Sequence, residues 1–397
     1  MTETQAGPLS GIRVVDLGRI AAGPFCSMLL GDLGAEVIRV ETPGGDAMRS
    51  QLPGFAPGVG GYFTTVNRNK RAVMLDLRAE AGLRALRKLL ETADVLVENF
   101  RPGVLEKMGL DPATLDRDYP NLIVTRISAY GHHGPKSDLP GVDQIVQAVS
   151  GFMSVTGTQE TGPIRAGFAI CDIYAGMSAA FGTLAALYAR KESGRGQVVQ
   201  TSLLQAILAV MSVQAGKYMA TDEAPPPEGN HHPVIAPYGL FPTSDGHVVL
   251  GVMRDEHFAA FAALCGHPEW SKDPRFEKTG GRSQHKDALR DLVTEATPCH
   301  STEDWLRLLE EADIPCGPVL TVKEAYEDPQ AQALGMTIET ELGDGTPIRV
   351  PGFLAQLSRT PMALNRPPPL PAEHTAEVLA EIGLADDAEV RKAAGLA

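Results

Sequence analysis

Cysteine is scarce in this 397-residue chain, and its spacing excludes two kinds of site. The five cysteines are scattered, and no two of them stand in a C-x-x-C spacing. An odd, scattered set predicts neither a disulfide framework nor a zinc site, so we expect no bound metal. Cys171 lies in an apolar run beside Asp172, where we expect a small buried thiol rather than a nucleophile.

Basic residues are also in short supply. The chain has 35 Lys and Arg residues against 49 Asp and Glu residues, a formal net charge of −14. Because binding to a nucleic-acid backbone needs a basic surface, this composition argues against a nucleic-acid partner. It leaves room for a local basic pocket.

Long apolar runs are missing as well. The chain has no uninterrupted run of 18 apolar residues, and residues 1–5 have neither a basic n-region nor an apolar h-region. With 43% hydrophobic and 21% charged residues, the composition is that of an ordinary globular protein. We therefore expect a cytoplasmic protein with no membrane partner.

The first part of the chain predicts a parallel sheet. Strand-like runs alternate there with amphipathic helical runs, as in a Rossmann-like α/β fold. The expected strands span residues 11–17, 36–41, 72–77, 94–100, 122–127 and 197–202, and the last leads into an apolar helix at 203–214. In such folds ligands bind beyond the carboxyl ends of the strands.

Two acidic residues stand out in the stretch that follows. Small and apolar residues recur at helical spacing after Asp172, from Ala175 to Ala189, so a tightly packed helix is expected to begin near Asp172. An Asp at a helix start is often an N-cap, and a purely structural N-cap is one interpretation of Asp172. A second acid, Asp143, lies upstream in the segment 141–151.

Composition changes near residue 221 and indicates three regions. We expect a large Rossmann-like domain at 1–220, a small α/β domain at 221–325 and a C-terminal segment at 326–397 that returns to the large domain. The Pro-rich stretch 221–233 predicts a linker or loop. Without a third ligand near them, its His231 and His232 are expected in a solvated loop rather than at a metal.

The order of several short motifs resembles the class III (CaiB/BaiF-type) CoA-transferases. This family includes formyl-CoA transferase, carnitine CoA-transferase and α-methylacyl-CoA racemase. The matching stretches are 16–24, 30–43, 69–71, 98–103, 130–135, 141–151, 165–190 and 194–197. The resemblance spans nearly the whole chain. It implies an interlocked homodimer that acts on coenzyme A thioesters and carboxylic acids without a permanently bound cofactor.

The resemblance also implies a mechanism and a set of site residues. The position of Asp172 is that of the nucleophile of the transferases, which passes through an aspartyl anhydride and an aspartyl-CoA thioester. The positions carried over as CoA contacts, with Arg39 beside them and with Val142 and Asp143 from the second acidic stretch, are Ala21, Ala22, Arg39, Thr42, Leu75, Arg78, Asn99, Phe100, Arg101, Lys107, Val142 and Asp143.

Other functions remain alternatives at this point. In a racemase of the same superfamily a histidine would stand where this chain has Val142, and His132 or His133 would have to replace it as a base. A non-catalytic CoA-binding protein would bind CoA without exchanging it. A nicotinamide dehydrogenase is disfavoured because the segment 18–23 lacks the G-x-G-x-x-G spacing.

The resemblance leaves the acid substrate open. Ala21 and Val142 replace the Gln and Tyr of formyl-CoA transferase, and its run of four glycines is missing between residues 230 and 251. Because those features shape the small-acid site of that enzyme, formate and oxalate are not expected as substrates. By family analogy, a dicarboxylate such as succinate is a candidate donor acid.

Overall fold

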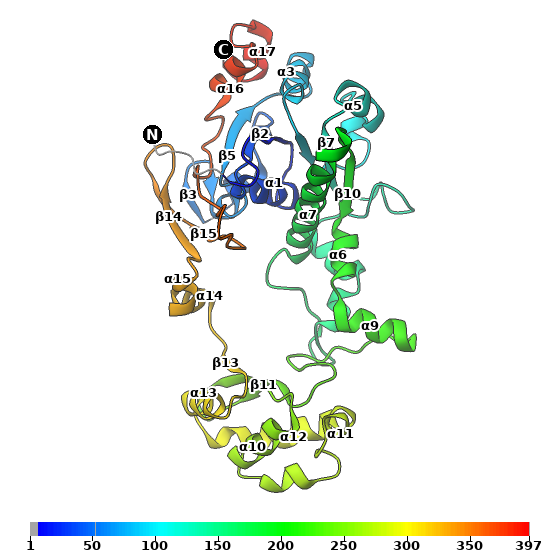
Figure 1. Ribbon diagram of the computed structural model, residues 1–397, viewed down its shortest axis with the longest axis vertical. Helices are drawn as coiled ribbons and strands as arrows, with labels where there is room; N and C mark the ends of the chain where they lie inside the picture. The colour runs from blue at the N-terminus through cyan, green and yellow to red at the C-terminus, as the bar shows by residue number, and fades with distance from the viewer. Residues whose placement is uncertain (1–6, 52, 397) are drawn as a thin grey trace. The chain divides into compact units, whose positions relative to one another are not determined.

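The computed structural model describes residues 7–51 and 53–396 and divides the chain into two compact units (Figure 1). The large unit comprises residues 1–152, 165–211 and 329–397, and the small unit comprises 153–164 and 212–328. The break after residue 211 falls earlier than the expected boundary after 220. It lies where the helix expected over 203–214 is interrupted, because Ser212 has a φ of 47° and begins a separate helix.

A six-stranded parallel sheet forms the centre of the large unit. Its order is β10-β7-β6-β1-β2-β5. The strands are β1 (Arg13–Asp16), β2 (Glu36–Glu41), β5 (Lys70–Met74), β6 (Val95–Glu98), β7 (Ile123–Ser128) and β10 (Val198–Ser202). The chain runs outward from β1 in one direction through β2 and β5, and from β6 in the other through β7 and β10. The sheet therefore reverses its winding between β1 and β6, which is where doubly wound folds bind ligands.

Helices cover both faces of this sheet and complete the expected α/β fold. Val14 and Val15 point to opposite faces and belong to two separate apolar cores. The helices of the large unit are α1 (Ala22–Asp32), α2 (Gly61–Thr64), α3 (Glu80–Leu90), α4 (Val104–Lys107), α5 (Pro112–Asp118), α6 (Asp143–Val149), α7 (Ile170–Ser193), α8 (Leu203–Ala209), α15 (Pro329–Ala333), α16 (Thr375–Glu381) and α17 (Ala388–Ala393). One core contains α1, α7 and α8, and the other contains α3, α16 and α17.

The long helix α7 packs closely on α1. A side chain at Gly176 would come 2.7 Å from the carbonyl oxygen of Ala22, so only glycine allows this approach. Ala175 and Ala179 are fully buried in the same contact. In the described part of the chain α7 has the length and hydropathy of a membrane span, as does the bent pair α8 and α9 (Ser212–Thr221) taken together. The small residues that α7 buries against α1 are those of a core helix.

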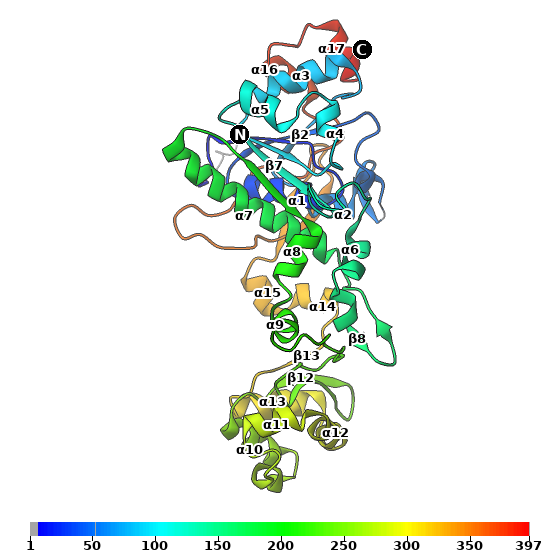
Figure 2. The ribbon, with the colours of Figure 1, turned by 90° about the vertical axis from the view of Figure 1, so that its right-hand side faces the viewer.

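The C-terminal segment is anchored to the large unit by residues 67–71. Arg68 donates to both carboxylate oxygens of Asp32, at 2.9 and 2.6 Å, and to the carbonyl oxygens of residues 351 and 352. Arg71 forms ion pairs with Glu377 and Glu381 of α16. α17 in turn packs against α3 (Figures 1 and 2). This charged stretch therefore holds the end of the chain against the sheet.

Two hairpins complete the large unit, and the small unit has a sheet of its own. The hairpins are β3 (Gly54–Ala56) with β4 (Val59–Gly60), and β14 (Thr337–Glu341) with β15 (Pro347–Pro351). The antiparallel sheet of the small unit consists of β11 (Tyr238–Pro242), β12 (His247–Gly251) and β13 (Cys316–Pro318). Its remaining elements are β8 (Gly157–Thr158), β9 (Gly162–Pro163), α9, α10 (Asp255–Leu264), α11 (Thr279–Gln284), α12 (Lys286–Ala296), α13 (Thr302–Glu311) and α14 (Val322–Glu327).

The two adjacent histidines of the small unit lie between α9 and β11 and are partly exposed. His232 stacks on Tyr238 with ring centroids 5.0 Å apart, and His231 meets Phe241 edge-on at 5.2 Å. Burial lowers the pKa of both imidazoles. Aromatic packing therefore covers part of each ring.

Candidate active site

A cavity of about 420 Å³ opens at the point where the sheet reverses its winding. It is formed by the loops that follow β1, β6 and β7 together with the first turn of α7, all within the large unit. Its lining includes Ile20, Asn99, Phe100, Ser128, Val142 and Asp172. The sequence predicted residues just past the strand ends as the place to look, and several of them meet here.

Asp172 is the third residue of α7 and is not its N-cap, so the interpretation of Asp172 as an N-cap was wrong. The N-cap position belongs to Ala169, which has no side-chain acceptor. Asp143 supplies one instead, since its Oδ1 accepts from the backbone N–H groups of Cys171 at 2.7 Å and Asp172 at 3.2 Å. The carboxylate of Asp172 is thus left for the cavity, half-buried at its wall.

A second bond from Asp143 extends this support. Its Oδ2 accepts from Nε2 of the fully buried Gln147 at 2.6 Å, and Oε1 of Gln147 accepts from the N–H of Ala166 at 2.8 Å. One carboxylate and one amide therefore fix both the approach to α7 and its first turn. Asp143 itself, expected as a CoA contact, holds the backbone of Asp172 and does not line the cavity.

The electrostatics of the site raise the pKa of Asp172 into the neutral range. Burial, and then the negative charge of Asp143, raise the pKa of Asp172 to about 7. A carboxylate that is harder to ionise is also more basic once ionised, which suits a nucleophile or a base. Burial raises the pKa of the neighbouring Cys171 thiol to about 12, so this cysteine stays a protonated, buried thiol as expected.

Tyr62 is a further residue near the two carboxylates, and the sequence did not reveal it. Burial raises its pKa to about 12, and the charges of Asp172 and Asp143 add to the shift. The phenol therefore remains protonated and can donate a hydrogen bond. Tyr62 lies in the one-turn helix α2 directly after Gly60 and Gly61, where no periodic pattern marks it.

Four of the twelve positions expected to bind CoA line the cavity, namely Asn99, Phe100, Arg101 and Val142. The side chains of three others, Ala21, Ala22 and Leu75, are fully buried. Thr42 is half-buried, whereas Lys107 and Arg78 are exposed, and Arg78 pairs with Asp76 at 2.9 Å. The cavity thus brings together Val142 and the three expected contacts that follow β6. The other eight expected contacts do not line it.

Arg39 does not fit the expected contact with CoA. Its side chain is 1% exposed and forms ion pairs with Asp16, Glu41 and Asp46. Its charge is therefore already neutralised inside the protein. Through Asp46, whose Oδ2 also accepts from the N–H of Ile20 at 3.1 Å, Arg39 supports the loop between β1 and α1.

Lys70 is a second buried cation beneath this loop. Its Nζ donates to Asp16, to the carbonyl oxygen of Pro24 and to Asn67. Burial lowers the pKa of Lys70 to about 8, while the charges of Lys70 and Arg39 overcome the effect of burial and hold the pKa of Asp16 below its ordinary value. These buried pairs fix the end of β1, from which the cavity wall begins.

The histidines that a racemase would need are not at the cavity. Both ring nitrogens of His132 are buried and have no hydrogen-bond partner among the residues that the structure describes, and burial together with the charge of Arg126 lowers the pKa of His132 to about 4. His133 is exposed. Neither side chain lines the cavity that contains Asp172.

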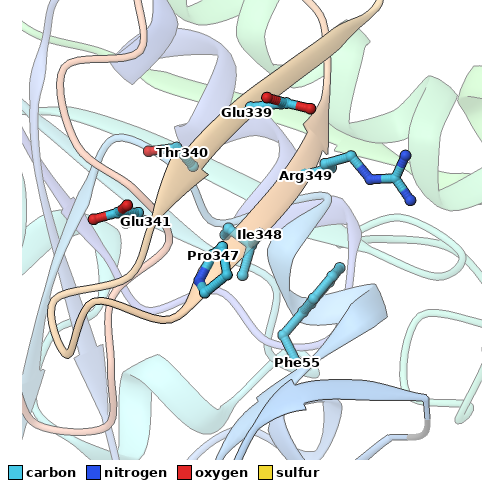
Figure 3. A pocket seen from close by; sticks show the side chains of 7 residues that line it. All are labelled: Phe55, Glu339, Thr340, Glu341, Pro347, Ile348 and Arg349. Carbon is cyan, nitrogen blue, oxygen red and sulfur yellow. The ribbon is translucent and has the colours of Figure 1, made fainter.

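A second cavity of the large unit, of about 610 Å³, carries none of the expected site residues (Figure 3). The hairpin β14–β15 and Phe55 form it. Among the described residues no group of three or more His, Cys, Asp or Glu side chains is arranged to hold a metal ion. The cavity at Asp172 is therefore the place where the expected nucleophile and four of the expected CoA contacts lie together.

Comparison with known proteins defines the class of this protein. Residues 9–375 match the model of CoA-transferase family III, and the chain belongs to that family. It is an enzyme that transfers CoA between an acyl-CoA thioester and a carboxylic acid.

Individual relatives agree with this class. The chain is 38% identical to a succinate–glutarate CoA-transferase of Agrobacterium fabrum, over 94% of this chain and 96% of the relative. It is 36% identical to a succinyl-CoA–D-citramalate CoA-transferase of Chloroflexus aurantiacus, over 96% of this chain and 95% of the relative. A crystal structure of a CAIB/BAIF family protein from Brucella suis superposes with a TM-score of 0.84 at 36% identity, over 95% of this chain and all of that one.

Proposed function

We propose that Asp172 is the nucleophile through which this enzyme moves CoA from a dicarboxylic acyl-CoA to a second carboxylic acid. The observation that carries the proposal is the placement of Asp172. Its half-buried carboxylate, with a pKa raised to about 7, faces the cavity while Asp143 binds its backbone. The names of the relatives support a dicarboxylate, since they specify succinate, glutarate and D-citramalate.

The first half of the reaction exchanges the acyl group for CoA on Asp172. A carboxylate oxygen of Asp172 attacks the thioester carbonyl, the C–S bond breaks, and CoA leaves as a thiolate. This gives a mixed anhydride. The thiolate then attacks the aspartyl carbonyl and releases the donor acid, which leaves an aspartyl-CoA thioester.

The second half runs the same steps in reverse. A carboxylate oxygen of the acceptor acid attacks the aspartyl thioester, and CoA thiolate leaves again. The thiolate attacks the acceptor's own carbonyl in the resulting anhydride, which forms the new acyl-CoA and restores Asp172. Each tetrahedral intermediate carries an oxyanion that needs a donor, and the protonated Tyr62 is a candidate beside the carboxylates.

Two exposed cations that follow β6 are candidates to bind the phosphate groups of CoA. Arg101 lines the cavity, and Lys107 lies at the end of α4 in the same connection after β6. Neither side chain forms an ion pair within the described ranges 7–51 and 53–396, so both are free to meet phosphate groups. Arg78, paired with Asp76 at the surface, is a weaker candidate.

We also propose that the protein is cytoplasmic and forms a homodimer, which is interlocked as the family resemblance implies. The dimer is supported by an apolar stripe on α7, where Phe181 and Tyr188 are 76% and 72% exposed and Met177 is 40% exposed. These residues follow helical spacing and lie on one face. Mixing tagged protein with untagged protein tests whether the two chains of the dimer are interlocked. Linked chains exchange subunits only after unfolding, whereas exchange under native conditions would exclude the linkage.

The proposed activity is tested by incubating the protein with succinyl-CoA and a panel of free mono- and dicarboxylic acids. New thioesters are identified by mass spectrometry. We expect acid-dependent formation of new acyl-CoA with dicarboxylates and no exchange of the α-proton of 2-methylacyl-CoA in deuterated water, because Val142 cannot transfer a proton. CoA binding without any new thioester would favour a non-catalytic binding protein.

A further inference from the structure

Arg19 is a cation in the wall of the cavity that contains Asp172. It lies in the loop between β1 and α1, and its side chain is exposed. Its guanidinium lies 5.3 Å from the centroid of the Phe100 ring. Over residues 7–51 and 53–396 this side chain forms no ion pair, unlike the buried cations Arg39 and Lys70 close to it.

The backbone around Arg19 is held firmly. Its N–H donates to Oδ1 of Asn99 at 2.7 Å, and its carbonyl oxygen accepts from Nδ2 of the same side chain at 2.9 Å. The next residue, Ile20, has a φ of 64° and donates its N–H to Asp46. A β-branched residue adopts this left-handed conformation only where the surroundings enforce it. The position from which the Arg19 side chain extends is therefore set by the loop.

We infer that Arg19 binds the distal carboxylate of a dicarboxylic acid substrate, an inference that rests on the proposed function and specifies its acid site. Only one carboxyl group of such an acid reacts, so the other stays ionised through every step. The cavity already contains the carboxylate of Asp172, and a second anion there needs a cation. A guanidinium matches a carboxylate with two parallel hydrogen bonds.

The other cation in the wall serves a different ligand. Arg101 follows β6, lines the cavity and is one of the CoA contacts that the family resemblance implies. The two arginines come from loops on either side of the point where the sheet reverses. This arrangement divides the cavity between the polyanion CoA and the second charge of the acid.

The test is a competition between acids that differ only in the distal carboxylate. With succinyl-CoA as donor, carbon-13-labelled succinate is paired with butyrate, and glutarate with pentanoate, and the new thioesters are quantified by mass spectrometry. We expect Arg19→Gln to lower the preference for the dicarboxylate in both pairs by about 10- to 100-fold. Arg19→Lys keeps the charge but not the paired hydrogen bonds, and should retain an intermediate preference.

Arg101→Gln is the matched control, with desulfo-CoA as the probe of CoA binding by calorimetry. We expect it to weaken binding of desulfo-CoA and leave the acid preference unchanged, whereas Arg19→Gln should do the reverse. Weaker binding of desulfo-CoA in Arg19→Gln with an unaltered acid preference would overturn the inference and make Arg19 a CoA anchor. If the unaltered protein forms no new thioester with any acid, the proposed function itself is refuted.

Discussion

Asp143 binds the backbone of Asp172 and at the same time repels its charge. Its Oδ1 lies 3.2 Å from the backbone nitrogen of Asp172 and 2.7 Å from that of Cys171, and its negative charge is the second cause, after burial, of the raised pKa of Asp172. One residue thereby fixes the position of the proposed nucleophile and increases its basicity. The two effects can be separated by substitution.

Asp143→Asn should shift the pH dependence of transfer, because it removes the charge while keeping an oxygen that can accept from α7. We expect the midpoint of kcat/KM against pH, near 7 for the unaltered protein, to move to lower pH. Asp143→Ala removes the acceptor as well and should lower kcat at every pH. A midpoint that stays in place in Asp143→Asn would show that Asp143 does not influence the titration of Asp172.

Asp172→Asn should stabilise the protein at high pH. A carboxyl group whose pKa is about 7 when folded and 3.8 when unfolded lowers the free energy of unfolding as the pH rises from about 4 to 7. At pH 8 we therefore expect the amide to increase the free energy of unfolding by about 1 to 4 kcal/mol. The gain should shrink towards pH 4 and vanish below about pH 3, where the carboxyl group is protonated in both states. Chemical denaturation at the two pH values measures it, and equal stability of both proteins at pH 8 would contradict the raised pKa.

Tyr62→Phe tests the phenol as an oxyanion donor. The ring is retained and only the hydroxyl is lost, so we expect kcat to fall by about 10- to 100-fold. Binding of desulfo-CoA should not change. Tyr119→Phe is the matched control, since that hydroxyl donates to the carbonyl oxygen of Arg87 and the negative charges that raise its pKa are those of Asp118 and Glu91. If kcat falls equally in both variants, the effect of Tyr62 is not specific to the site.

Arg68→Ala should destabilise the attachment of the C-terminal segment. It would leave the carboxylate of Asp32, whose side chain is fully buried, without the guanidinium that binds both of its oxygens. We expect the free energy of unfolding to fall by about 3 to 5 kcal/mol. Arg78→Ala, in the exposed pair with Asp76, is the control and should change little. Limited proteolysis should then cleave first within residues 351–366 in the Arg68 variant.

Local patterns were sufficient to predict much of the sheet. The strand expected over 36–41 coincides with β2, because the β-branched residues Val37, Ile38 and Val40 favour a strand. The position of Asp172 near the start of a long helix also followed from the spacing of small residues. Both features depend on neighbours within a few turns.

Roles that depend on distant residues could not be predicted. Asp143 reaches the N-terminus of α7 across 29 positions of the chain, which no local pattern encodes. Arg39 was expected beside the CoA contacts, but it pairs with Asp16, 23 positions away on β1, as well as with its sequence neighbours Glu41 and Asp46. A surface cation and a buried one have the same letter in a sequence, and only the packing of their neighbours distinguishes them.

The central claim is that CoA becomes covalently attached to Asp172. The most direct measurement is mass spectrometry of the protein quenched in acid after brief exposure to succinyl-CoA without an acceptor acid. We predict a CoA adduct on the peptide that contains Asp172, its disappearance when glutarate is added, and its absence in Asp172→Ala together with the loss of transfer. An adduct on another residue, or transfer by Asp172→Ala at more than about a tenth of the original rate, would contradict the mechanism.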